Sequence, residues 1–231
     1  MHAERPLVLL HGALGTGGTL SPVADLLHDD FKIFCPDFPG HGSRAGTSEV
    51  LRMDILAEFL GSYFSEHDLR NPLVFGFSMG GYVALTHAVR HPGVISAIVT
   101  LGTKYDWSPE IAQQEAGMLD ADLLRRKVPA FADVLAERHG AMQWKSLLQR
   151  TAEMMVDLGA TPILTVERVR QLHIPVHICR GSEDRMVMES ESISMADMLP
   201  NGRYIRIEGL LHPIEKAPPA VVADLIRDAF G

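Results

Sequence analysis

The sequence predicts an α/β protein in which about six strands form an open, mostly parallel sheet with helices on both faces. Short apolar runs, such as residues 7–10 and 94–101, are typical of buried parallel strands. Between such runs lie segments in which apolar residues recur at helical spacing, and strands that alternate with helices form parallel sheets. A chain of 231 residues is long enough to bury one substantial core of this kind.

The first elements are a strand, a short helix and a second strand. The apolar run 7–10 predicts the first strand, which ends in a glycine-rich loop. Ser21 and Pro22 are typical of the N-cap and first position of a helix. The run 31–35 predicts the second strand, and a loop with prolines and glycines over 36–42 ends it.

A helix, a strand and a second helix follow, before the next strand over 94–101. Leu51, Ile55, Phe59 and Tyr63 recur every four residues and predict the buried face of a helix from about 50 to 64. The next expected elements are a strand over 73–75 and a helix over 82–90, which the triplet His91-Pro92-Gly93 ends.

The pattern changes between residues 104 and 159, where no strand-like run occurs. Helical stretches are expected there over 120–127, 129–138 and 142–158. We therefore predict a helical cap over 104–159, inserted into an α/β core formed by residues 1–103 and 160–231. After the cap we expect a helix over 161–172, a strand over 175–180, a helix over 189–199, a strand over 204–207 and a closing helix over 218–230.

The turn after the third strand carries the main chemical signal, the pattern G-x-S-x-G. This pattern places a serine on a sharp, strained turn between strand and helix, and it needs small residues two positions to either side. Gly76 and Gly80 meet that need, which makes Ser78 the candidate nucleophile. The alternative for the motif taken alone is an ordinary Gly/Ser turn.

Two further side chains follow strands of the same sheet. Reactive groups collect at the carboxyl ends of parallel strands, where Asp184 follows the fifth strand and His212 the sixth. A serine hydroxyl is a weak nucleophile, so His212 is the candidate base and Asp184 the carboxylate that holds its imidazole. Asp184 is favoured over Glu183 and Asp106 because it has the G-x-x-D spacing after a strand.

Two backbone N–H groups are candidates for stabilising the negative charge that builds on a carbonyl oxygen after attack. Met79 begins a helix directly after the serine, and the loop after the first strand brings Ala13 within reach. Ala13 and Met79 are therefore the expected oxyanion donors.

These motifs together resemble the α/β-hydrolase family. The matching pieces are His11-Gly12, residues 37–42, residues 76–81, residues 181–187, and His212 with Glu215 and Pro218 behind it. They cover nearly the whole chain except the cap. The sequence is similar to small bacterial members, which include esterases, thioesterases and menaquinone-pathway lyases. Only six residues precede Leu7, so the family's usual N-terminal pair of antiparallel strands is not expected.

The resemblance implies that Ser78 is the nucleophile, Asp184 the acid, His212 the base, and Ala13 and Met79 the oxyanion donors. The expected reaction is cleavage of a small-molecule carboxylic ester or thioester through an acyl-enzyme, with no metal or organic cofactor.

Two other functions stay open. A lyase would use the same triad to abstract a proton and eliminate a group, with Arg44, Arg125 or Arg168 binding a substrate carboxylate. A binding module would keep the triad for ligand capture, with little turnover.

The cap is expected to cover the site and to choose the substrate. Its large soft side chains include Trp107, Trp144 and Met142, which are the candidates for the wall of the substrate pocket. Most side chains of this kind are expected simply to pack between cap and core.

Composition argues against several other classes of protein. The chain has 21 basic and 29 acidic residues, a net charge of −8, and no long basic cluster that would bind nucleic acid. No apolar stretch is long enough to span a membrane, and Met1–Pro6 lacks the features of a signal peptide, so a cytoplasmic location is expected.

Several chemistry-bearing side chains are expected to be structural. Cys35 and Cys179 are expected to be free thiols in the core. His87 and His91 have the spacing of zinc ligands on a helix but lack a further ligand, so no metal site is expected. Asp37 is expected to hydrogen-bond the loop that follows it.

Overall fold

The computed structural model of the protein describes residues 5–231 except residues 48 and 49. Most of the segment Met1–Pro6, for which no signal peptide was predicted, lies outside the described residues. The described strands form one six-stranded sheet in the order β2-β1-β3-β4-β5-β6, and every neighbouring pair is parallel. The strands are β1 (Pro6–Leu10), β2 (Lys32–Phe34), β3 (Leu73–Phe77), β4 (Ala97–Leu101), β5 (Val176–Gly181) and β6 (Gly202–Ile207). The predicted six-stranded α/β fold is confirmed.

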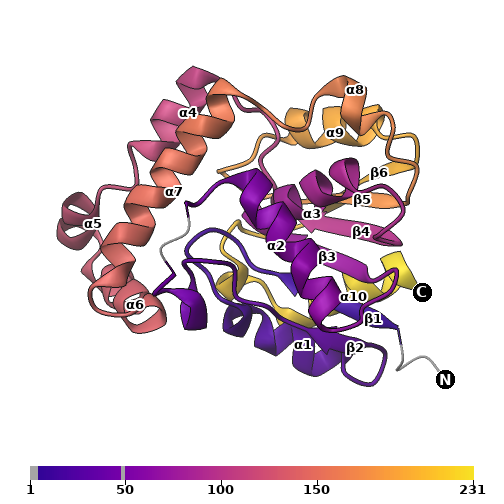
Figure 1. Ribbon diagram of the computed structural model, residues 1–231, viewed down its shortest axis with the longest axis horizontal. Helices are drawn as coiled ribbons and strands as arrows, with labels where there is room; N and C mark the ends of the chain where they lie inside the picture. The colour runs from indigo at the N-terminus through magenta and orange to yellow at the C-terminus, as the bar shows by residue number, and fades with distance from the viewer. Residues whose placement is uncertain (1–4, 48–49) are drawn as a thin grey trace.

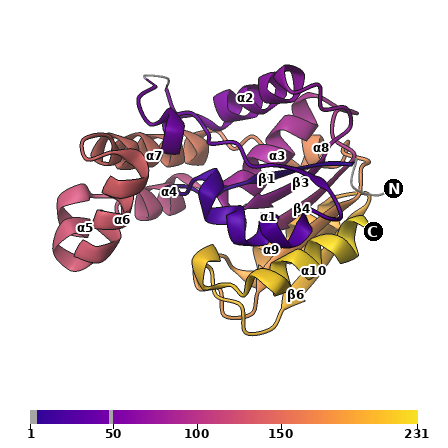
Figure 2. The ribbon, with the colours of Figure 1, turned by 90° about the horizontal axis from the view of Figure 1, so that it is seen from below.

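Helices cover both faces of the sheet (Figures 1 and 2). On one face lie α1 (Ser21–Leu27) and α10 (Pro219–Phe230), and on the other lie α2 (Met53–Glu66) and α3 (Met79–Arg90). Side chains of a strand alternate between the two faces, and β1 serves both layers. Leu7 and Leu9 join the cluster under α1 and α10, whereas Val8 and Leu10 join the cluster under α2 and α3.

Four helices lie beyond the carboxyl ends of the strands, at the left of Figure 1. They are α4 (Pro109–Ala116), α5 (Ala121–Lys127), α6 (Pro129–His139) and α7 (Gln143–Ala160), and we call them the cap helices. Helix α7 packs along α4 and contributes Trp144, Leu147 and Leu148 to the buried core. The division into a core of 1–103 and 160–231 and a cap of 104–159 stays a prediction.

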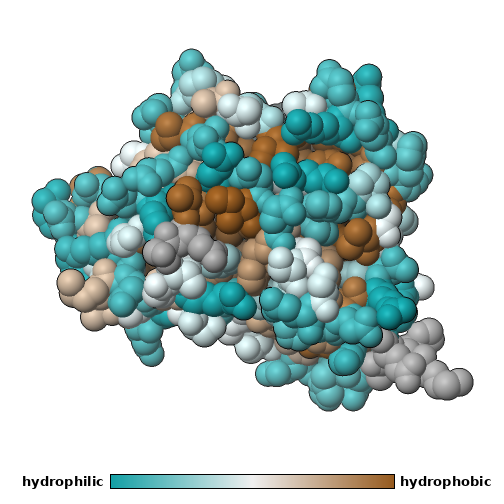
Figure 3. Space-filling view, in the orientation of Figure 1, coloured by the Kyte–Doolittle hydropathy of each residue, from teal (hydrophilic) through white to brown (hydrophobic). Residues whose placement is uncertain are grey.

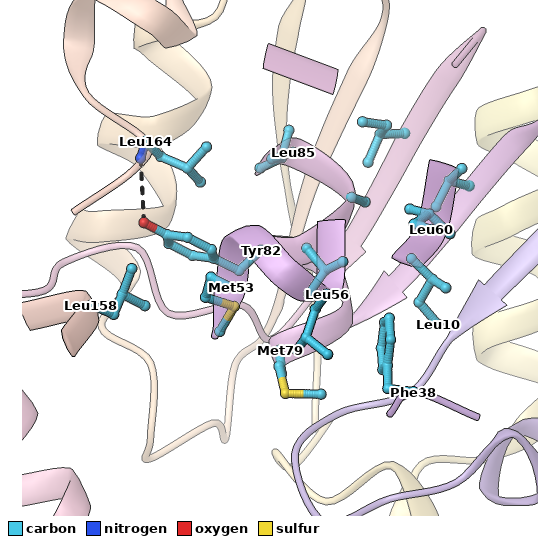
Figure 4. Packing of buried hydrophobic residues seen from close by; sticks show 14 of the residues in the cluster. Leu10, Phe38, Met53, Leu56, Leu60, Met79, Tyr82, Leu85, Leu158 and Leu164 are labelled. Carbon is cyan, nitrogen blue, oxygen red and sulfur yellow. Dashed lines mark hydrogen bonds between the residues drawn. The ribbon is translucent and has the colours of Figure 1, made fainter. Parts of the chain in front are cut away.

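The predicted helix over 161–172 is wrong. Only the single turn α8 (Val166–Val169) is helical there. The N–H groups of Ile163 and Leu164 donate instead to the hydroxyl of Tyr82 on α3, each at 3.3 Å (Figure 4). Because these donors have a partner outside the segment, the chain before Val166 does not form a helix.

The predicted face of α2 is also wrong. The buried residues of this helix are Met53, Leu56, Ala57, Leu60 and Phe64, not the predicted stripe through Ile55, Phe59 and Tyr63, and Leu51 precedes the helix. Two adjacent apolar stripes wind along α2, so spacing alone did not identify the inner one. The outer stripe is half-buried against the core.

One further helix was missed, and another was predicted closely. Helix α4 was not predicted, although Ser108 accepts from the N–H of Ile111 and Pro109 begins the helix, which is a recognisable start signal. Helix α9 (Glu189–Met198) lies close to its predicted position.

Candidate active site

Ser78 lies between the end of β3 and the start of α3 in a backbone conformation that non-glycine residues rarely adopt, with φ 50° and ψ −117°. Hydrogen bonds of its backbone groups hold it there. Its N–H donates to the carbonyl of Leu101 at 2.8 Å, and its carbonyl accepts from the Thr103 hydroxyl at 2.9 Å and from the Gly81 N–H at 3.0 Å. Strained residues of this kind persist only where the surroundings fix them, as the end of β4 does here.

The glycines beside Ser78 are required by close backbone approach. A Cβ on Gly76 would lie 2.4 Å from the backbone nitrogen of Gly81, and a Cβ on Gly80 would lie 2.4 Å from the carbonyl oxygen of Leu10. Both distances are far shorter than any real carbon contact, so β3, α3 and β1 can meet only around these glycines. The sharp turn that the sequence predicts is therefore present.

Asp184 and His212 form a hydrogen-bonded pair. The Nδ1–H of His212 donates to Oδ2 of Asp184 at 2.8 Å, while Oδ1 accepts from the N–H groups of Met186 at 2.8 Å and Val187 at 3.0 Å. Burial alone would raise the pKa of Asp184, but the hydrogen bond and charge of His212 and the two backbone donors lower it below its ordinary value. The carboxylate therefore stays ionised, and His212 keeps the tautomer whose Nε2 can accept a proton.

The rival carboxylates lie elsewhere. Glu183 and Asp106 are exposed, and the backbone of Asp106 is occupied by a hydrogen bond to Glu191 at 2.8 Å. The preference for Asp184 over Glu183 and Asp106 thus agrees with the hydrogen bond between Asp184 and His212.

Ser78 and the Asp184–His212 pair border the same segment at the end of β4. A Cβ on Gly102 would lie 3.2 Å from Oδ2 of Asp184 and 3.3 Å from Nδ1 of His212, and the next residue, Thr103, donates to Ser78. The ring of Phe77 lies 5.4 Å from that of His212, centroid to centroid. In the described part of the chain no hydrogen bond joins the Ser78 hydroxyl to His212, so the complete triad stays a prediction.

The candidate oxyanion donors lie on either side of Ser78. Residues 12–15 form a turn closed by a 3.1 Å hydrogen bond from the N–H of Gly15 to the carbonyl of Gly12, and Ala13 is in this turn. Met79 is the first residue of α3. Neither the N–H of Ala13 nor that of Met79 donates to an acceptor within the described residues, so both are available to a ligand.

His11 orders the loop that carries Ala13. It is fully buried; its Nδ1–H donates to the carbonyl of Gly12 at 2.8 Å, and its Nε2 accepts from the N–H of Phe38 at 3.1 Å. Burial lowers the pKa of His11 to about 4, so the imidazole is neutral at neutral pH. Asp37 accepts from Gly17 and from Ser43, so its surroundings are structural, although these donors lie outside the predicted turn over residues 38–42.

A small cavity of about 50 Å³ opens beside Ser78. Its wall comes from the core and from α7, and Figure 3 shows apolar side chains gathered at the surface between α7 and the start of α2. Met79 and Tyr82 also appear in Figure 4, where they lie beside Met53. The lining residues are Ala13, Met53, Ser78, Met79, Tyr82, Lys104, Trp107, Met154 and Met155.

The three predicted pocket residues lie in different places. Trp107 lines the cavity at Ser78. Trp144 is almost fully buried beneath the guanidinium of Arg125, and Met142 is 82% exposed. Neither Trp144 nor Met142 lines the cavity, so only Trp107 enters the proposal below.

Sequence reasoning missed Lys104 and Glu191. Lys104 is the only cation among the lining residues, and it lies 3.4 Å from Glu115 and 3.8 Å from Glu191. Glu191 is buried and accepts from the N–H groups of Tyr105, at 2.7 Å, and Asp106. No sequence signal marked this pairing, because Glu191 is on α9, far along the chain from Lys104.

The other candidate groups have structural surroundings. Both cysteines are free thiols; Cys179 is buried in β5 and Cys35 is half-buried after β2. His91 hydrogen-bonds Glu58, and the described residues contain no group of three His, Cys, Asp or Glu side chains placed to hold a metal ion. Among the described helices, none combines the length and apolar character needed to cross a bilayer. The cytoplasmic location stays a prediction.

Known proteins with related sequences include an esterase and a synthase. The chain is 33% identical over 108 residues to the pimeloyl-(acyl-carrier protein) methyl ester esterase of Vibrio cholerae, a match that covers 47% of this chain and only 39% of the esterase. It is 27% identical to the 2-succinyl-6-hydroxy-2,4-cyclohexadiene-1-carboxylate synthase of Pectobacterium atrosepticum, across 96% of this chain and 92% of the synthase.

Comparison with solved structures shows a shared fold. A putative lipase from Acinetobacter baumannii superposes with a TM-score of 0.81 at 18% identity, covering 97% of this chain and 83% of the lipase. A model of the alpha/beta hydrolase family matches residues 7–225. That match spans the sheet, the strained serine and the Asp184–His212 pair, and the protein therefore belongs to the alpha/beta hydrolase family.

Proposed function

We propose that the protein is a serine hydrolase that cleaves a carboxylic ester or thioester through an acyl-enzyme on Ser78. The observation that carries this proposal is the composition of the cavity wall. Ser78 lines the cavity together with Ala13 and Met79, whose N–H groups are available for hydrogen bonding. A carbonyl carbon placed against the Ser78 hydroxyl would thus have its oxygen beside two donors.

The proposed reaction has two halves. In the first, Nε2 of His212 takes the proton of the Ser78 hydroxyl, and Oγ bonds to the carbonyl carbon. The N–H groups of Ala13 and Met79 bind the oxyanion, which collapses as the alcohol or thiol leaves with the proton from His212. In the second half, water adds to the acyl-enzyme with the same base, and the acid and free Ser78 are released.

The cavity favours a short, uncharged acyl group. Its volume of about 50 Å³ is well below the roughly 300 Å³ at which ligand pockets for drug-sized molecules begin. The wall is mainly apolar, with Met154, Met155 and Trp107 from the cap region. Lys104 adds a positive charge, but the neighbouring Glu115 and Glu191 offset it, so a negatively charged substrate gains little there.

The lyase alternative has one observation in its favour and one against it. The match to the cyclohexadiene-carboxylate synthase covers nearly the whole chain. Against it, none of the predicted carboxylate-binding arginines lines the cavity at Ser78. Arg44 lies over the Phe59 ring, Arg125 pairs with Asp133, and Arg168 donates to the carbonyl of Ile163.

The test combines covalent labelling with substrate profiling. Wild-type protein is treated with a fluorophosphonate and analysed by mass spectrometry, and p-nitrophenyl esters of increasing acyl length are assayed beside a cyclohexene-carboxylate substrate. We expect an adduct on Ser78 and fastest turnover of the shortest esters. Ser78→Ala should lose both signals, whereas Ser62→Ala, which changes an exposed serine of α2, should keep them.

Three outcomes would overturn the proposal. Absence of both adduct and ester turnover would exclude an acyl-enzyme. Elimination from the cyclohexene-carboxylate without ester cleavage would assign the lyase reaction. Tight stoichiometric binding of an ester with negligible turnover, measured by calorimetry beside the rate assay, would assign a binding module with a vestigial triad.

A further inference from the structure

The last turn of the cap helix α6 makes direct contact with two loops of the candidate active site. His139 is 1% exposed although it is at the end of a cap helix. Its Nδ1 accepts from the N–H of Gly42 at 3.0 Å, and its Nε2 lies 2.9 Å from the carbonyl oxygen of Leu14. Because a carbonyl oxygen only accepts, Nε2 carries the proton, and the neutral ring bridges a donor and an acceptor 28 residues apart.

The Leu14 carbonyl belongs to the turn that carries the candidate oxyanion donor Ala13. Leu14 has φ 60°, a left-handed conformation that glycine or asparagine normally occupies at the third position of such a turn. A leucine is strained in this conformation and stays only where its surroundings hold it. The hydrogen bond from His139 fixes the peptide that follows this strained residue.

The neighbouring residue, Arg138, reaches the opposite side of the site. Its Nη2 donates to Oε1 of Glu215 at 2.9 Å. Glu215 lies in the short helix η3 (Ile214–Lys216), three residues after the candidate base His212. The Arg138 side chain is 22% exposed and that of Glu215 is 46% exposed, so only the arginine end of the ion pair is shielded from water.

Two consecutive residues at the end of α6 therefore contact both loops: His139 binds the turn that carries Ala13, and Arg138 binds the segment that follows His212. We propose that Arg138 and His139 are positioning residues, through which the cap helix α6 holds Ala13 and His212 in register with Ser78. The inference rests on the proposed serine hydrolase function, because the distance-sensitive step is the attack of Ser78 on a carbonyl group.

The geometry makes a specific substitution informative. The side-chain amide of His139→Gln can accept from Gly42 and donate to Leu14, as the neutral ring does, whereas His139→Ala can do neither. Arg138→Met keeps the apolar stem but breaks the ion pair with Glu215. Arg126→Met, on the exposed surface of α5, is the matched control for loss of a cap arginine.

Kinetics of p-nitrophenyl acetate hydrolysis test the proposal. We expect His139→Ala to lower kcat at least about tenfold while KM changes less than about threefold, because a positioning defect acts on the transition state. His139→Gln should recover most of kcat, Arg138→Met should show a smaller loss, and Arg126→Met none. We call the contacts of Arg138 and His139 with the two loops the cap clamp. An unchanged kcat in folded His139→Ala, or equal losses of kcat in the Gln and Ala variants, would overturn the proposed role of the cap clamp.

A second measurement separates this inference from the function on which it rests. Amide hydrogen exchange of Gly42 and Gly15 is followed in wild type and in the His139 variants. Faster exchange of both amides in His139→Ala, but not in His139→Gln, supports the clamp even if wild-type protein hydrolyses no ester. Unchanged exchange in His139→Ala refutes it whatever the enzyme's activity. If His139→Ala does not fold, the remaining variants decide. We then expect His139→Gln to retain most of the wild-type kcat and Arg138→Met to show a lower kcat, and an unchanged kcat in Arg138→Met would overturn the proposal.

Discussion

Mild acid should destabilise the protein through its buried histidines, and His11 allows the size of the effect to be worked out. Burial lowers the pKa of His11 from 6.5 to about 4, because desolvation of the charged ring outweighs the hydrogen bond to the Gly12 carbonyl and the charge of Asp37, which raise it. Between pH values of about 4 and 6.5, His11 is therefore protonated in the unfolded chain but neutral in the folded chain. At about 1.4 kcal/mol per pH unit, the full penalty is about 3 kcal/mol.

The sign of the effect follows from the depressed pKa of a base. Above about pH 6.5 His11 is neutral in both states and stability is complete; below it the unfolded state gains protons and stability falls until the pH reaches the folded value. Between about pH 7 and pH 5 the His11 contribution alone should fall by about 2 kcal/mol. His41 and His139, whose pKa values burial also lowers, should add to the loss.

The three histidines share one buried cluster, so their charged neighbours matter. The ring centroids of His11 and His41 lie 5.0 Å apart, and those of His41 and His139 lie 5.7 Å apart. Asp37, Arg138 and Arg150 are the charged groups that act on them. Asp37 would favour a proton in the cluster and the two arginines oppose it, so the net effect of burial stands.

Urea unfolding monitored by circular dichroism at several pH values measures the effect. His11→Gln is the informative variant, because its amide can donate to Gly12 and accept from Phe38 without titrating. We expect the variant to lose about 2 kcal/mol less than wild type between about pH 7 and pH 5. Equal losses in the two proteins, or a wild-type free energy of unfolding constant to within about 0.5 kcal/mol, would refute the reasoning.

Two further substitutions test other parts of the site. Gly102→Ala places a Cβ 3.2 Å from Oδ2 of Asp184 at a φ of 61°. We expect this variant to lose about 1–2 kcal/mol of stability in urea unfolding and to have at least about tenfold lower kcat. Gly93→Ala, at φ 83° with open space around it, is the control and should lose stability but not activity. Glu191→Gln weakens the hydrogen bonds from Tyr105 and from the Asp106 backbone and should lower the free energy of unfolding by about 1–3 kcal/mol in the same assay, and no loss would contradict the anchoring role of this buried carboxylate.

Much of the fold could be predicted because its signals are local. The strands lie in apolar runs, and the turn at Ser78 is marked by Gly76 and Gly80, whose small size the packing of β3 against α3 requires. Asp184 follows a strand at a recognisable spacing, and the structure joins it to His212. Such patterns can be read from one sequence because the residues that enforce them are close neighbours in it.

The rest could not be predicted because its causes lie far away along the chain. The segment before Val166 is not helical, since the N–H groups of Ile163 and Leu164 donate to Tyr82, about 80 residues earlier. Trp144 looks like a pocket residue in sequence, yet it is buried in the core and does not line the cavity at Ser78. Lys104 lines the cavity with its charge offset by Glu191, a partner that no spacing rule connects to it.

His139 belongs both to the cluster of buried histidines and to the contacts of α6 with the active-site loops. His139 bridges Gly42 and Leu14 only while its Nδ1 is unprotonated, since a second N–H would face the N–H of Gly42. The folded state keeps that nitrogen free because burial lowers the pKa of His139. The same desolvation that makes the protein sensitive to acid therefore keeps the bridge intact near neutral pH. Acid that protonates His139 should accordingly release α6 from the oxyanion turn.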